Sequence, residues 1–151
     1  MEEFQELKEN IKFEFELEKI VIDNLEKDKI NLLFQDGRVF SHFIESWLDN
    51  NCERLQKVNG CKNHDFIDIK TNIKYEQKTW TRNGLTFIPS NMLGSQRKIN
   101  ISKFEYMTKK RKFIIVNNIY FPKIKIKFLD GYTLLEKYPS GITREKNTNF
   151  F

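Results

Sequence analysis

The amino-acid sequence predicts a single α/β domain in which a mixed β-sheet is flanked by helices. A chain of 151 residues is the size of one domain and can bury a core. One segment repeats its apolar residues at helical spacing, and several later segments alternate apolar with polar residues as strands do. The chain contains no run of 18 apolar residues, so we expect no membrane span.

The acidic N-terminal segment has two competing patterns. Phe4, Leu7 and Ile11 fit a helix, whereas Phe13 and the apolar residues after it alternate as in a strand. Residues 1–28 carry ten acidic and four basic residues, a net charge of −6. We place this segment, up to residue 36, outside the core of the domain, which we expect over residues 37–129.

The clearest helix is predicted over residues 38–51, after the break at Asp36-Gly37. Its apolar residues recur at i, i+1, i+4 and i+5 and form one face. They are Val39, Phe40, Phe43, Ile44, Trp47 and Leu48. This amphipathic face predicts a helix that packs on the sheet.

A β-hairpin is predicted next, with strands over residues 66–69 and 73–80. Lys70-Thr71-Asn72 forms the turn, and residues 81–98 form a loop that contains Gly84 and Gly94.

A short helix is predicted over residues 102–110, with Ser102 as its N-cap. Two further strands are predicted over residues 112–116 and 123–129. The resulting order is helix, strand, strand, loop, helix, strand, strand, which gives a mixed sheet with helices beside it.

The hairpin concentrates charged residues at one end. Glu76 and Lys78 are two positions apart and therefore share one face of their strand. A two-residue turn would bring Asp65 to this face, whereas a three-residue turn would bring Asp68 there instead. The simplest interpretation is an exposed hairpin with a cross-strand ion pair, which contributes little stability.

Two neighbouring carboxylates repel each other unless a cation lies between them. Ligands that are all oxygen suit Mg²⁺, which keeps several waters and shares its shell with phosphate oxygens. A nearby lysine can act on the attacking water or stabilise charge that develops on a phosphate. The hairpin thus has the groups needed for phosphodiester hydrolysis.

The stretch Asp65-Phe66-Ile67, a turn, and then Glu76-Gln77-Lys78 resembles the PD-(D/E)XK nuclease superfamily. In that pattern an aspartate opens one strand and a (D/E)-x-K group closes the next; His64 stands where proline is frequent. The order of elements over residues 37–129 resembles the αβββαβ core of restriction endonucleases.

The resemblance implies that Asp65 and Glu76 hold Mg²⁺, or Mn²⁺ as the alternative, and that Lys78 acts at the water. Asp68 is the alternative to Asp65 as metal ligand and catalytic residue. Members of the superfamily often have a further glutamate near the metal, on the preceding helix. Glu45 is the one glutamate of residues 38–51, and we expect a solvated or capping role for it.

The loop over residues 81–98 is a candidate for reading DNA. Arginine pairs with guanine and asparagine or glutamine with adenine in the major groove, while lysine contacts phosphates. The loop residues with these chemistries are Arg82, Asn83, Asn91, Gln96, Arg97 and Lys98. A plain surface loop is the alternative interpretation.

Basic residues dominate the rest of the chain. Residues 29–151 carry twenty-two basic and eleven acidic residues, a net charge of +11, which suits a polyanionic partner. Two lysine-rich stretches, residues 109–112 and 123–127, are candidates for contacts with the DNA backbone.

The sequence thus favours a magnesium-dependent endonuclease that cuts double-stranded DNA at specific sites, of the homing or restriction kind. A Holliday-junction resolvase of the same fold, a non-catalytic nucleic-acid-binding module and a protein–protein adaptor remain alternatives. Cutting both strands implies a homodimer or homotetramer, with the N-terminal segment and the tail over residues 130–151 as candidate interfaces.

The two cysteines, Cys52 and Cys61, are expected to be reduced thiols of a cytoplasmic protein. The acidic N-terminus does not resemble a secretory signal.

Overall fold

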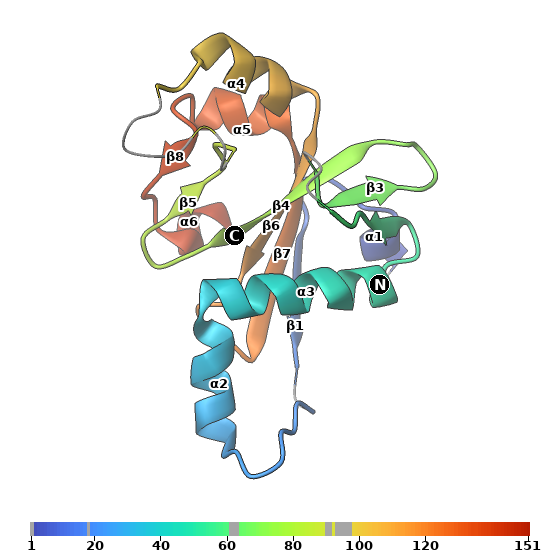
Figure 1. The fold of residues 1–151 in the computed structure, drawn as a ribbon, viewed down its shortest axis with the longest axis vertical. Helices are drawn as coiled ribbons and strands as arrows, with labels where there is room; N and C mark the ends of the chain where they lie inside the picture. Colours follow the sequence, from blue (N-terminus) through green and yellow to red (C-terminus); the bar gives the residue numbers. More distant parts are fainter. Residues whose placement is uncertain (1, 18, 61–63, 90–91, 93–97) are drawn as a thin grey trace.

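In the computed structural model, residues 2–17, 19–60, 64–89, 92 and 98–151 are described. A six-stranded mixed sheet forms the centre and helices lie on both of its faces, which confirms the predicted α/β class (Figure 1). The strands are, in spatial order, β1 (Lys12–Glu16), β7 (Lys123–Asp130), β6 (Lys112–Asn117), β4 (Lys74–Trp80), β3 (Phe66–Asp68) and β2 (Leu55–Lys57).

One parallel pair organises the sheet. β4 and β6 run parallel, and the crossover between them contains α4 (Ile101–Lys109), while the other neighbouring pairs are antiparallel. The crossover explains the predicted order of helix and strands, because parallel neighbours need a long connection.

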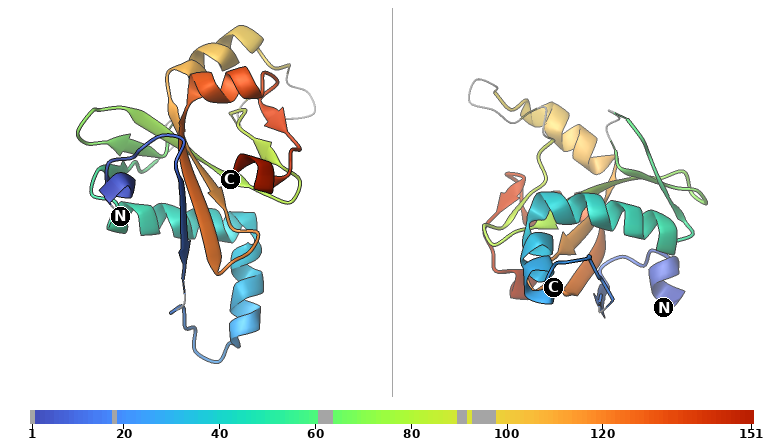
Figure 2. Two further views of the ribbon diagram at one scale, coloured as in Figure 1. Left: turned by 180° about the vertical axis from the view of Figure 1, so that it is seen from behind. Right: turned by 60° about the horizontal axis from the view of Figure 1, so that its bottom comes forward.

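The first face of the sheet is covered by the N-terminal half of the chain. α3 (Gly37–Asn51) lies across the strands, and α1 (Glu2–Gln5) and α2 (Lys27–Gln35) pack beside it (Figures 1 and 2). The core here is rich in phenylalanine, and Phe40 and Ile44 of α3 are fully buried. The helix predicted over residues 38–51 is therefore confirmed, with Asp36 as its N-cap.

The second face is covered at one end by the C-terminal part of the chain. α4 and α5 (Gly131–Lys137) pack there, together with a small sheet of β5 (Leu85–Thr86) and β8 (Ile142–Thr143) and the short α6 (Asn147–Phe150). Gly131 allows the close approach of α5 to α4, since an added Cβ would lie 1.7 Å from the Thr108 carbonyl oxygen.

The hairpin of β3 and β4 has a longer turn than either length considered from the sequence. Phe66 pairs with Tyr75 and Ile67 with Lys74, so four residues, 69–72, form the turn. Asn72 adopts a positive φ of 62°, and its amide donates to the Asp68 carbonyl. Ile69, expected at the end of the strand, is 62% exposed in the turn.

Several elements were not part of the order of helices and strands predicted over residues 37–129. β1 forms one edge of the sheet, and β2 forms the other edge where a loop was expected. The tail supplies α5 and α6, and Phe150 packs on Trp80 with 4.7 Å between ring centroids. The predicted cap of α4 was wrong, because Asn100 rather than Ser102 accepts the capping hydrogen bond from Lys103 N.

Among the described residues, no helix is both long and apolar enough to cross a membrane.

Candidate functional site

The site begins where β3 and β4 diverge. Asp65 immediately precedes β3 and lies beside β4, close enough to Glu76 for the two carboxylates to interact electrostatically. Two backbone contacts hold Asp65 there: its amide donates to the Tyr75 carbonyl at 3.0 Å, and its Oδ2 accepts from Gln77 N at 2.8 Å. The structure therefore brings together the two carboxylates that the sequence proposed as a pair.

Glu76 is held between two cations. Lys78 Nζ lies 3.6 Å from Glu76 Oε1, and Arg111 Nη1 lies 3.3 Å from Glu76 Oε2. The Glu76 side chain is 16% exposed and that of Arg111 only 11%. Each carboxylate oxygen thus faces one positive charge in a largely water-excluded position.

The ionised form of Glu76 is nevertheless less favoured than that of a glutamate in water. Burial and the neighbouring charge of Asp65 raise the pKa of Glu76, although Lys78 and Arg111 oppose the shift. A carboxylate whose pKa is raised despite two adjacent cations lies in a strongly desolvated and like-charged environment. Such perturbation is typical of functional sites, although structural ion-pair networks also produce it.

A third carboxylate approaches from α3. Burial and the charge of Asp65 raise the pKa of Glu45, whereas Lys57, whose Nζ lies 3.7 Å from Glu45 Oε2, lowers it. Glu45 is 17% exposed, so it is neither the solvated nor the capping residue expected from the sequence. Asp65 thus interacts electrostatically with one carboxylate on a neighbouring strand and another on the helix.

Asp68 lies on the opposite face from Glu76 and has a structural partner. Arg54 Nε donates to its Oδ1 at 3.1 Å, and Arg54 Nη2 forms a second, shorter contact with its Oδ2. The Lys70 amide and the Thr71 hydroxyl also donate to this carboxylate, which is 1% exposed. The four-residue turn therefore leaves Asp68 away from Glu76, and we no longer consider it a candidate ligand or catalytic residue.

Arg111 and Glu45 are the site residues that sequence reasoning missed or assigned elsewhere. Arg111 was grouped with the basic stretch over residues 109–112, yet its side chain turns inward to Glu76. The crossover through α4 brings Arg111 next to β4, and the local sequence around Arg111 does not indicate this contact. For Glu45, its place as the one glutamate of the helix was a signal, but burial could not be inferred from it.

The predicted DNA-reading residues are only partly described. Arg82 and Asn83 lie in the turn after β4, at the far end of that strand from Glu76, and both are exposed. Lys98 is also exposed, shortly before α4. Asn91, Gln96 and Arg97 lie outside the described residues. Arg82 and Asn83 line a solvent-open hollow, together with Arg144.

The two lysine-rich stretches differ in exposure. Lys109 and Lys110 are exposed, whereas Lys112 pairs with Glu9. On β7, Lys127 Nζ donates to the Phe150 carbonyl at 2.9 Å, while Lys123 and Lys125 line an open hollow on the second face.

The described residues fit Mg²⁺ in part. Among them, no three His, Cys, Asp or Glu side chains converge closely enough to hold a metal ion. However, Asp65 and Glu76 lie near each other, and Mg²⁺ needs only one or two carboxylates beside waters and phosphate oxygens. Burial and then the charge of Asp65 raise the pKa of Glu76, and a bound cation would relieve the repulsion between the two carboxylates.

The comparisons with known proteins identify no relative. No family model matches the chain, and neither a curated protein nor a solved structure matches it.

Proposed function

We propose that this protein is a Mg²⁺-dependent endonuclease that hydrolyses phosphodiester bonds in double-stranded DNA. The observation that supports this most directly is the proximity of Asp65 to Glu76, with Lys78 Nζ 3.6 Å from Glu76 Oε1. This arrangement agrees with the order and spacing of the PD-(D/E)XK pattern that the sequence resembles.

In the proposed mechanism, Asp65 and Glu76 hold the metal ion and Glu45 adds negative charge from α3. The bound ion would polarise the scissile phosphate and favour attack by water. Lys78, 3.6 Å from Glu76 Oε1, orients the attacking water and stabilises charge on the phosphate. Arg111 keeps the Glu76 carboxylate in place from the opposite side, at 3.3 Å.

The proposed activity carries two further expectations. One domain offers one such site, so cutting both strands requires a homodimer or homotetramer. Arg82, Asn83 and Lys98 are exposed and available to a DNA partner, and the net charge of +5 favours association with a polyanion.

The test is a cleavage assay on plasmid and genomic DNA, with Mg²⁺ and with EDTA. Four proteins are compared: the wild type, Glu76→Gln, Lys78→Ala and the control Lys29→Ala, in which an exposed lysine of α2 is removed. We expect metal-dependent fragments from the wild type and the control. Both site variants should lose activity by at least ~100-fold, because each removes a group that acts on the transition state.

An enzyme should lose cutting in Lys78→Ala while it retains DNA binding, whereas a binding module has no cutting to lose. If wild type and variants bind DNA alike and none cuts plasmid, genomic or four-way-junction DNA, the catalytic proposal is wrong. The charges of the hairpin would then be structural.

A further inference from the structure

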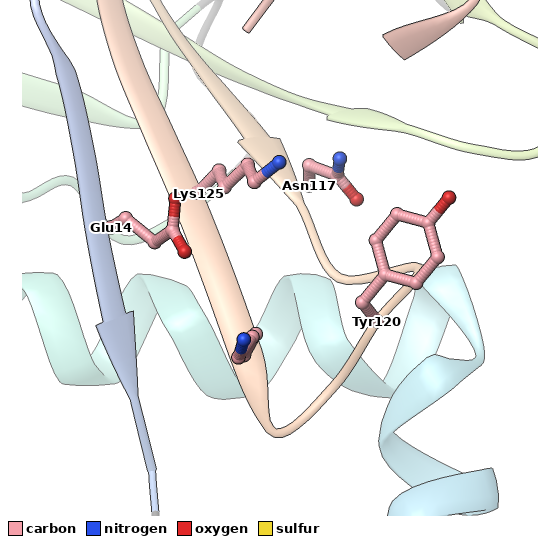
Figure 3. A pocket seen from close by; sticks show the side chains of 5 residues that line it. Glu14, Asn117, Tyr120 and Lys125 are labelled. Atoms are coloured by element: carbon pink, nitrogen blue, oxygen red, sulfur yellow. The ribbon is translucent and has the colours of Figure 1, made fainter. Parts of the chain in front are cut away.

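Three adjoining hollows extend from the second face of the sheet, beside the loop after β6, to the small sheet of β5 and β8. The first, of about 290 Å³, is lined by Glu14, Asn117, Tyr120, Lys123 and Lys125 (Figure 3). The second, of about 310 Å³, shares Tyr120 with it. The third, of about 600 Å³, shares Arg82 and Arg144 with the second. Because neighbouring hollows share lining residues, we treat them as one trough.

The trough is strongly basic. Its basic lining residues are Arg82, Lys123, Lys125, Arg144 and Lys146. Within the described part of the chain, none of these five side chains forms an ion pair. Unpaired cations along a hollow of this length create a field that attracts a chain of phosphates.

The two acidic residues of the trough are already engaged by groups outside it. Glu14 Oε2 lies 3.4 Å from Lys12 Nζ, and Glu145 Oε2 accepts a hydrogen bond from the Tyr138 hydroxyl. Neither Lys12 nor Tyr138 lines the trough. The hydroxyl of Tyr138 leaves the charge of Glu145 in place, but five basic against two acidic lining residues still make the trough net positive.

Asn117 offers an unused hydrogen-bond donor beside the first hollow. Its side chain is 2% exposed, and its Oδ1 accepts from Ile119 N at 2.8 Å, which fixes the orientation of the amide. Its Nδ2 has no partner among the described residues. A buried donor without a partner is unfavourable, so an acceptor atom of a ligand in this hollow would stabilise the arrangement.

Tyr120 stands at the junction of the first two hollows and is 55% exposed (Figure 3). An exposed aromatic ring between basic side chains is suited to stack an unpaired base, while the cations contact the phosphates on either side. A base in a duplex is stacked on its neighbours and cannot offer its face to this ring. The arrangement therefore selects an unpaired strand over an intact duplex.

We propose that the trough binds an unpaired DNA strand, with a base on Tyr120 near Asn117 and phosphates on Lys123, Lys125 and Arg144. The inference rests on the proposed nuclease function and narrows its substrate to DNA in which a duplex adjoins an unpaired strand. Trp80, which lines the second hollow, is four residues along β4 from Glu76, roughly 13 Å at the rise of a strand. Glu76 and the part of the trough around Trp80 thus lie on one face of the sheet.

The experiment measures binding without cleavage. Fluorescence anisotropy in EDTA compares a labelled single strand with the blunt duplex of the same sequence, at several salt concentrations. The proteins are the wild type, Tyr120→Ala, Tyr120→Phe, Lys123→Ala/Lys125→Ala and the control Lys8→Ala/Lys29→Ala, which removes two exposed lysines outside the trough. Thermal melting of each variant verifies the fold.

The single strand should bind more tightly than the duplex. Tyr120→Ala should weaken single-strand binding by about tenfold, and Tyr120→Phe should keep it, because the ring rather than the hydroxyl carries the stacking. The Lys123→Ala/Lys125→Ala variant should reduce the slope of log affinity against log salt by about 1.4, since each lost phosphate contact removes about 0.7. The control should match the wild type.

Wild-type affinity of Tyr120→Ala and of the lysine variant would overturn the trough proposal, as would tighter binding of the duplex. These results are independent of cleavage. Loss of binding in the trough variants, with no cleavage by the wild type, would refute the nuclease and leave the trough standing. Cleavage that depends on Lys78, with unchanged binding in the trough variants, would support the nuclease and refute the trough proposal.

Discussion

Asp65 and Asp68 lie three residues apart on one strand segment, yet their surroundings differ completely. Asp68 receives four hydrogen bonds, two of them from Arg54, and burial of its charge is fully compensated. Asp65 instead lies near Glu76 and Glu45, and its charge adds to the effect of burial in raising the pKa of both glutamates. One end of the hairpin stabilises the fold, and the other holds like charges together.

This difference separates structural from functional carboxylates. A folded chain has no stability reason to place like charges in a desolvated position, so the arrangement around Asp65 is the better candidate for chemistry. Four substitutions or titrations test the contrast, from the largest expected effect to the smallest.

Removing the Asp68 carboxylate should cause the largest loss in the free energy of unfolding. Asp68→Ala leaves Arg54 without its buried partner and also removes the acceptor of the Lys70 and Thr71 hydrogen bonds. We expect a loss of about 3–5 kcal/mol in the free energy of unfolding, measured by urea denaturation. Asp65→Ala is the matched control and should cost less than about 1 kcal/mol; equal losses would remove the contrast.

Lowering the pH should remove the stability that the ionised Asp68 carboxylate contributes. Burial alone raises the pKa of Asp68, but the hydrogen bonds from Arg54, Thr71 and Lys70 N outweigh it and lower the pKa from 3.8 to about 2. A lowered folded-state pKa gives stability that is present above pH 3.8 and lost as pH falls through about 2. The loss should amount to about 2 kcal/mol in the wild type and be absent in Asp68→Asn. A pH profile of Asp68→Asn parallel to the wild type would contradict this.

Glu76→Gln should change the free energy of unfolding by less than Asp68→Ala does, and in the opposite direction. The pKa of Glu76 is raised by burial and by Asp65, so the folded state retains the proton to higher pH than the unfolded chain does. Stability that depends on this group is therefore present below pH 4.5 and falls as pH rises through the folded-state pKa. The glutamine variant should match or exceed the wild type at neutral pH by less than about 1 kcal/mol, since the lost ion pairs contribute little.

A clear destabilisation of Glu76→Gln at neutral pH would mean that the pairs with Lys78 and Arg111 outweigh burial and repulsion. The group would then be structural, as Asp68 is.

Local pattern was sufficient to predict the helix of α3 and the strands of the hairpin. The helix follows from six apolar residues at i, i+1 and i+4 spacing, and Asp36 caps it. α2 was missed because only Ile30 and Phe34 are buried, while Leu32 is 67% exposed and blurs the helical period.

The site itself depended on details that sequence cannot supply. The register was left open because the turn length was unknown; the four-residue turn is stabilised by Asp68 bonding to Lys70 N and Thr71 Oγ1, a tertiary arrangement that also needs Arg54. The contact of Arg111 with Glu76 joins residues 35 apart through the crossover. Sequence spacing predicted which charges share β4, but not which distant cations meet them.

The smallest expected effect is a change in the pKa values of two glutamates, and it tests the role of Asp65 specifically. In Asp65→Asn, the like charge that raises the pKa of both Glu45 and Glu76 is removed while the side-chain volume is kept. Carbon-detected NMR titration should then show both glutamates releasing their protons at lower pH than in the wild type, with Glu76 still above its usual range because burial persists. Asp68→Asn is the matched control, since its carboxylate lies on the other face and contributes to neither shift. Unchanged titrations in Asp65→Asn would mean that burial alone sets these pKa values, and the argument that a cation relieves repulsion between Asp65 and Glu76 would lose its basis.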